Sequence, residues 1–128
     1  MLAYFPGPLL DRFDLRVHVP AVEQDALMNA QVGESSATIA QRVWAARQCQ
    51  YERQGSSNGR ITIAQLEAVA QVDADGRKLL DMAMRRFELS ARAYHRVLKV
   101  SRTIADLAQS ESIQSEHIAE ALQYRGVL

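Results

Sequence analysis

The chain has 128 residues, a formal net charge of zero and a composition that is 48% hydrophobic and 23% charged, which is typical of one globular domain and excludes a disordered chain. Its single cysteine, Cys49, excludes an intrachain disulfide and fits a reduced, cytoplasmic setting. The sequence has no run of about 18 apolar residues and begins without a signal-peptide pattern, so we predict no contact with a membrane.

Residues 1–33 differ from the rest of the chain. They hold all three prolines, Pro6, Pro8 and Pro20. Residues 13–19 alternate apolar and polar side chains, which predicts a half-buried strand that ends at Pro20. One strand cannot pair its own backbone groups, so its ladder partners would lie outside this sequence. We therefore expect residues 1–33 to be poorly ordered, or to pack against the rest of the chain or another copy.

Residues 34–128 predict helices joined by short loops, and hence a helical bundle. Ser35 or Ser36 can cap a long first helix, and Gly55 suits a left-handed turn at its end. The inward stripe predicted for this helix is Ile39, Val43, Ala46 and Cys49, with Trp44 and Tyr51 beside it. Thr62 and Gln65 form a capping box before a short helix. No functional role is assigned to residues 54–60.

The second half of the chain gives further helix signals. Asp73 or Asp75 can open a third helix, and a last helix is expected from about Ser115 to Tyr124, stopped by Gly126. Ile113 reads as a lone apolar residue in a polar loop.

One amphipathic helix, at about residues 90–109, organises the rest. Ser90 is a good N-cap for it. Its inward stripe is predicted as Leu89, Ala93, Val97, Val100, Ile104, Leu107 and Ala108. Its other side is predicted as Arg92, His95, Arg96, Lys99, Arg102 and Asp106. This helix is the expected centre of the bundle.

Most reactive side chains have an ordinary interpretation. His18, His95 and His117 have no partners at metal-ligand spacing, so we predict no metal site. Cys49 falls on an inward stripe and reads as a small core residue. No glycine-rich phosphate loop is present, so this chain alone cannot be an ATPase.

Two arginines stand out by position. Arg12 lies between a Pro/Gly turn and the predicted strand, where it can reach out of the molecule. Arg92 lies in the first turn of the central helix, where the free N–H groups disfavour a cation unless an anion binds there. The alternative is that both are solvated surface arginines, and spacing alone favours that alternative.

Residues 7–15, 33–37, 89–107 and 117–125 closely resemble the C-terminal part of the magnesium-chelatase-related AAA+ ATPases of the ComM and YifB type. The resemblance implies an all-α helical lid at residues 34–128. It also implies that residues 1–33 are the end of the ATPase core, with its arginine-finger motif and last strand. The phosphate loop and the Mg²⁺-binding motif would belong to a missing N-terminal ATPase core.

The resemblance also gives roles to the two arginines. In the motif L-D-R-F-D, Arg12 would be the arginine finger that reaches the γ-phosphate of ATP bound by a neighbouring subunit. Arg92 would be the sensor-2 arginine that contacts the ATP phosphate. ATP and Mg²⁺ would serve the full-length protein, a cytoplasmic hexameric ring and an active ATPase, and neither should bind tightly to this chain.

Three functions are considered, in descending order of support from the sequence. The first is a motor subunit for DNA processing in recombination and transformation, with DNA as a partner. The second is the lid of a magnesium-chelatase motor subunit for porphyrin metallation. The third is a stand-alone helical module that binds DNA through Arg92, Arg96, Lys99 and Arg102, which the zero net charge disfavours.

Overall fold

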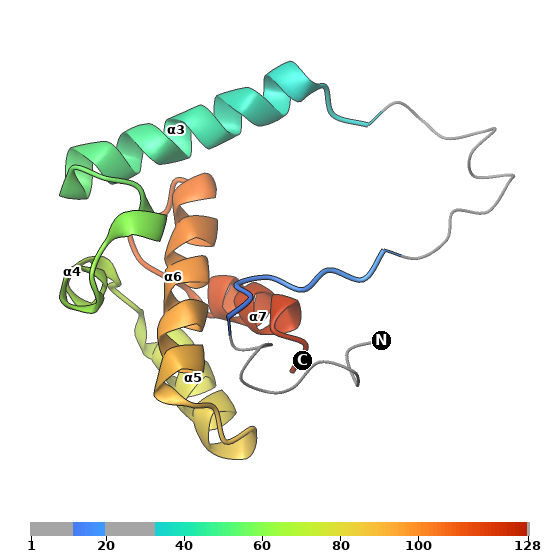
Figure 1. Ribbon diagram of the computed structural model, residues 1–128, viewed down its shortest axis with the longest axis vertical. Helices are drawn as coiled ribbons and strands as arrows, with labels where there is room; N and C mark the ends of the chain where they lie inside the picture. The colour runs from blue at the N-terminus through green and yellow to red at the C-terminus, as the bar shows by residue number, and fades with distance from the viewer. Residues whose placement is uncertain (1–11, 20–32, 128) are drawn as a thin grey trace, which may run out of the picture.

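The computed structural model of the chain describes residues 12–19 and 33–127. These residues form α3 (Ser36–Gln54), the 3-10 turn η2 (Asn58–Arg60), α4 (Ile63–Val69), α5 (Ala74–Arg86), α6 (Ala91–Leu107) and α7 (Ser115–Tyr124), as Figure 1 shows. The predicted all-α class is therefore confirmed. Predictions that fall on residues 1–11 and 20–32, including the Pro/Gly turn and Pro20, lie outside the described residues, and the division at residue 33 stays a prediction.

Local sequence signals set the helix ends. Ser35 and Ser90 accept hydrogen bonds from the backbone N–H groups three residues on, at 3.1 Å in both helices. Thr62 and Gln65 form the predicted capping box of α4. Gly55 ends α3 with φ of +79°, a conformation that favours glycine. These caps confirm the predicted boundaries.

Helix α6 is the centre of the bundle. It contacts α3, η2, α4 and α7, and α5 packs against α7. Figure 1 shows α3 lying across the C-terminal end of α6. The buried apolar core is Ile61, Leu66, Ala70, Leu80, Ala83, Val97, Leu98, Ala105, Ile113, Ile118, Ala121 and Leu122. The prediction that the 90–109 helix organises the chain is confirmed.

The stripe predicted for α3 is largely wrong. Ile39 and Val43 are each 42% exposed and Trp44 is 65% exposed, whereas Ala46 and Gln50 are the buried residues. Burial is confined to the part of α3 that lies against α6 and η2. Periodicity identifies an apolar face, but it does not say how much of that face has a neighbour.

Ile113 is fully buried rather than isolated in a polar loop. It forms a parallel bridge with Val72. Its N–H donates to the carbonyl of Gln71 at 2.7 Å, and its carbonyl accepts from the N–H of Asp73 at 2.9 Å. This pairing joins the α4–α5 and α6–α7 connections and completes the core between them.

Residues 13–19 pair with no strand among the described residues, so the predicted strand does not form in this chain. The apolar side chains of Phe13, Leu15, Val17 and Val19 are 45 to 81% exposed. Instead, the segment contacts α6 and α7 through single hydrogen bonds and an ion pair.

Candidate functional site

The first turn of α6 is suited to meet an anion. The Ser90 hydroxyl accepts from the N–H of Ala93, and Arg92, which lies between these two residues, has an exposed side chain. Among the described residues, the Arg92 side chain has no hydrogen-bond or ion-pair partner. A cation in the first turn of a helix costs about 0.3–1 kcal/mol against the helix dipole. An incoming anion would remove that cost.

An open groove of about 410 Å³ lies beside Arg92. Its apolar side includes the buried Ile61 and Leu66 and the exposed Ile63. Its other lining residues are Thr62, Ala91, Arg92, His95, Arg96 and Lys99. The groove thus combines an apolar wall with a row of basic side chains.

Two of these basic side chains already have partners. His95 lies 3.7 Å from the carboxylate of Glu67, a contact that is ionic only when the histidine is protonated. Arg96 forms an ion pair with Asp14. Within the described part of the chain, Arg92 and Lys99 are the groove's basic side chains without such a partner. An anion entering this groove would therefore meet Arg92 and Lys99 first.

Arg12 is also exposed, on the segment that runs beside α6 and α7. The structure brings its neighbour Asp14 to Arg96, one helical turn from Arg92. It shows no contact between Arg12 and Arg92 themselves. Asp14 has no predicted role, and Arg96 is predicted only as one of the four basic residues of a DNA-binding module. The only available signal for their pairing is their opposite charge.

Arg102 and Asp106 correct the predicted outer face of α6, because each is only 1% exposed. Nε of Arg102 donates to Oδ1 of Asp106 at 3.1 Å. The terminal nitrogens of Arg102 donate to three backbone carbonyls, those of Ser110 at 2.7 Å, Glu111 at 2.8 Å and Val69 at 3.3 Å. Burial lowers the pKa of Arg102, and the carboxylate of Asp106 opposes that shift. Every terminal nitrogen of this guanidinium is thus used inside the protein.

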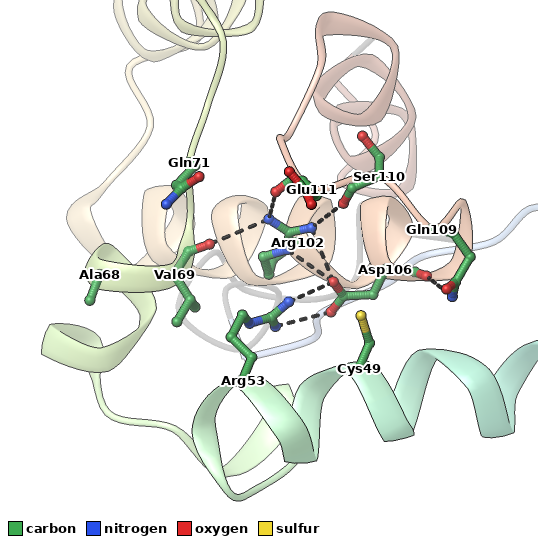
Figure 2. Close-up of a pocket in the computed structure, with 10 residues that line it drawn as sticks. All are labelled: Cys49, Arg53, Ala68, Val69, Gln71, Arg102, Asp106, Gln109, Ser110 and Glu111. Carbon is green, nitrogen blue, oxygen red and sulfur yellow. Dashed lines mark hydrogen bonds and ion pairs between the residues drawn. The ribbon is translucent and has the colours of Figure 1, made fainter.

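A second arginine reaches the same carboxylate from α3, as Figure 2 shows. Nη1 and Nη2 of Arg53 donate to the two oxygens of Asp106 at 2.8 and 3.1 Å. Asn58, from the unassigned loop, donates to Asp106 at 3.0 Å and to the hydroxyl of Thr103 at 3.0 Å. A cavity of about 320 Å³ borders this cluster. The polar groups of the cluster form hydrogen bonds with one another, so the cluster joins α3, η2 and α6 structurally.

The remaining reactive side chains have separate settings. Nδ1 of His117 accepts from the N–H of Gln114 at 3.0 Å and helps to cap α7. Cys49 is half-buried beside the Arg53 cluster. Residues 12–19 and 33–127 contain no group of three potential metal ligands. Nor do these ranges include a helix that is both long and apolar enough to cross a bilayer.

Comparison with known proteins identifies the family of this domain. Residues 33–125 match the model described as "Magnesium chelatase, subunit ChlI C-terminal". The chain belongs to that family. It is 42% identical over 123 residues to the competence protein ComM of Haemophilus influenzae, with 95% of this chain and 24% of the relative covered. It is 40% identical to YifB of Escherichia coli, with 94% and 24% covered.

A more distant relative is Rv2897c of Mycobacterium tuberculosis, which is 33% identical over 128 residues, with 97% of this chain and 25% of the relative covered. The predicted resemblance to the ComM and YifB type is confirmed. The chain spans about a quarter of the length of these relatives. It is thus a magnesium-chelatase-related C-terminal domain, and an alignment over 95% of the chain takes in both Arg12 and Arg92.

Proposed function

We propose that this domain is the helical lid of a ring-forming AAA+ ATPase and that Arg92 contacts the phosphate of bound ATP. The observation that carries the proposal is the exposed Arg92 guanidinium. It lies in the first turn of α6, which Ser90 caps, and it has no partner among the described residues. A planar guanidinium can pair with two phosphate oxygens at once. The helix N-terminus adds N–H groups and a dipole that also favour an anion.

Arg12 has the second role, that of an arginine finger for ATP bound by a neighbouring subunit. Its exposed position next to a segment that contacts α6 and α7 supports this role. Such an arginine offsets negative charge that spreads over the phosphoryl oxygens during hydrolysis. ATP and Mg²⁺ would bind the ATPase core of the complete protein. We expect no ATP hydrolysis by residues 1–128 alone.

DNA processing is the work we propose for the complete protein. Its support is the 42% identity to a relative that is named a competence protein. Porphyrin metallation is the second candidate, because the matching family is described by magnesium chelatase. We rank it lower because the relatives at 42% and 40% identity carry the names ComM and YifB.

Two contacts argue against the hypothesis of a stand-alone DNA-binding module. Arg102 is buried against Asp106, and Arg96 is paired with Asp14. Of the four basic residues predicted to contact DNA, only Arg92 and Lys99 have side chains without such a partner in the described ranges. Salt-sensitive binding of DNA by this chain would revive the module, and a flat titration at low salt would remove it.

The complete ATPase with Arg92→Ala tests the proposal. Loss of a charge-assisted contact of about 1.5–3 kcal/mol should lower kcat/KM for ATP roughly 10- to 100-fold. The matched control is Arg60→Ala, which removes an exposed arginine from η2 and should leave hydrolysis unchanged. Equal rates for Arg92→Ala and the unmodified protein would refute the sensor role. Stimulation of hydrolysis by DNA, rather than by a porphyrin with its chelatase partners, would separate the two candidate tasks.

A further inference from the structure

The segment that carries Arg12 is attached to the helical domain at three consecutive points. The carbonyl of Phe13 accepts from Nη1 of Arg125 at 2.9 Å. The carboxylate of Asp14 pairs with Arg96 of α6. The N–H of Arg16 donates to the carbonyl of Tyr124 at 2.7 Å. These contacts join residues 82 to 112 positions apart in the sequence.

The two contacts to the end of α7 fix the backbone of the segment. Arg125 is 4% exposed, so its guanidinium is itself held in place. Tyr124 is the last residue of α7, and its carbonyl lacks a partner within the helix, so the N–H of Arg16 satisfies it. The guanidinium of Arg16 also lies beside Gly126, where a cation suits the negative end of a helix. Both contacts use main-chain atoms of the segment, so they set its register.

The ion pair between Asp14 and Arg96 connects the segment to the helix that bears Arg92. Arg96 follows Arg92 by one turn, and its partner Asp14 follows Arg12 by two residues. The side chains of Arg96 and Asp14 are 31% and 53% exposed. An ion pair of that exposure is weak, so its loss should change the population of the attached segment by no more than about fivefold.

Leu15 and Val17 lie on the side of the segment that faces the same two helices. They line a cavity of about 390 Å³ together with Val100, Ile104 and Tyr124. The segment thus lies along α6 and α7 with some of its apolar side chains toward them, as an alternating segment without a sheet would do.

We propose that Asp14, Arg96 and Arg125 are positioning residues that hold the Arg12 segment in a fixed relation to the helix that bears Arg92. This proposal rests on the proposed function and adds a coupling to it. A movement of α6 would carry Arg92 and the anchor of Arg12 together, so the two arginines would reach their phosphate positions as one unit. Displacement of a catalytic group by about 1 Å can cost about 10²-fold in rate.

The test compares Arg96→Ala, Arg12→Ala and Arg60→Ala in the complete ATPase. Arg96→Ala should lower kcat by up to about fivefold and leave nucleotide affinity within about twofold. Arg60→Ala, which removes an exposed arginine of η2 outside the groove, should behave as the unmodified protein. The exchanged pair Asp14→Arg with Arg96→Asp should recover most of the lost rate, which a merely structural role for Arg96 would not require.

A second readout uses the 128-residue chain itself. Amide hydrogen exchange should protect the N–H of Arg16, and protection should fall in Arg96→Ala and Arg125→Ala. Normal kcat in Arg96→Ala, with Arg12→Ala inactive, would overturn the coupling and leave the proposed function intact. Normal kcat in Arg12→Ala would overturn the finger assignment and the coupling to it. An unprotected Arg16 amide would overturn the attachment in either case.

Discussion

Asp106 lies buried one turn after Arg102 on α6, with 3.1 Å between Oδ1 of Asp106 and Nε of Arg102. Arg53 of α3 donates to both oxygens of the same carboxylate. Two guanidinium groups therefore share one carboxylate, and that of Arg102 is buried with it. The free energy of this site depends on every partner remaining, because a buried charge without a partner is costly.

Asp106→Asn should destabilise the chain by about 3–5 kcal/mol, since it leaves the buried Arg102 without its counter-charge. Urea unfolding of the 128-residue chain, followed by circular dichroism, measures the change. Asp81→Asn is the matched control, because Asp81 is an exposed carboxylate on α5. Similar midpoints for the two variants would show that the carboxylate of Asp106 does not compensate Arg102.

Arg102→Lys should cost about 2 kcal/mol although it keeps the charge. One ammonium cannot replace the fork that reaches the carbonyls of Val69, Ser110 and Glu111 as well as Asp106. These part-buried carbonyls would lose their donors. Thermal unfolding checks this, with Arg85→Lys on the exposed face of α5 as the control. An unchanged melting temperature would mean that charge alone is what the site requires.

Gly76→Ala should destabilise the chain, although alanine usually favours a helix over glycine by about 0.5–1 kcal/mol. A Cβ at Gly76 would lie 2.9 Å from Cγ1 of Val72, 3.0 Å from Oδ1 of Asp73 and 3.2 Å from the carbonyl oxygen of Ile113. We expect a net loss of about 1–3 kcal/mol from this crowding. Gly59→Ala meets no atom within 4 Å and should be neutral or slightly stabilising. A gain at Gly76 comparable to that at Gly59 would contradict the packing.

Ile113→Ala should cost about 2–5 kcal/mol, because Ile113 is fully buried at the junction of two connections. Ile63→Ala is the comparison, since Ile63 is 56% exposed and its removal should change stability by about 0.5 kcal/mol or less. Equal losses at the two positions would mean that Ile113 does not belong to the core.

The helix ends could be predicted from sequence because their causes are local. Ser90, the pair of Thr62 and Gln65, and Gly55 each act within three or four residues, and all form the expected caps. The burial of Ile113 could not be predicted in this way. Its partner Val72 is 41 positions away (113 − 72), and nothing in the local pattern indicates the pairing.

The predicted solvent exposure of Arg102 and Asp106 was wrong for a related reason. Periodicity assigns arginine and aspartate to the solvent side of a helix, and it does so for Arg102 and Asp106. Their spacing of four residues does permit an ion pair on one helix. The third member, Arg53, is contributed by another helix, so only the tertiary structure shows that the pair can be buried. The exposed position of Arg92, by contrast, agrees with its predicted face, and its role in ATP hydrolysis stays a prediction.

The turnover of the complete ATPase with Arg12→Ala tests the central claim most directly. Nucleotide affinity and kcat would be measured on the same preparation, beside the Arg60→Ala control. An arginine finger contributes about 10³-fold or more to kcat, so we predict near-complete loss of hydrolysis with nucleotide binding retained. Normal hydrolysis by Arg12→Ala would contradict the account.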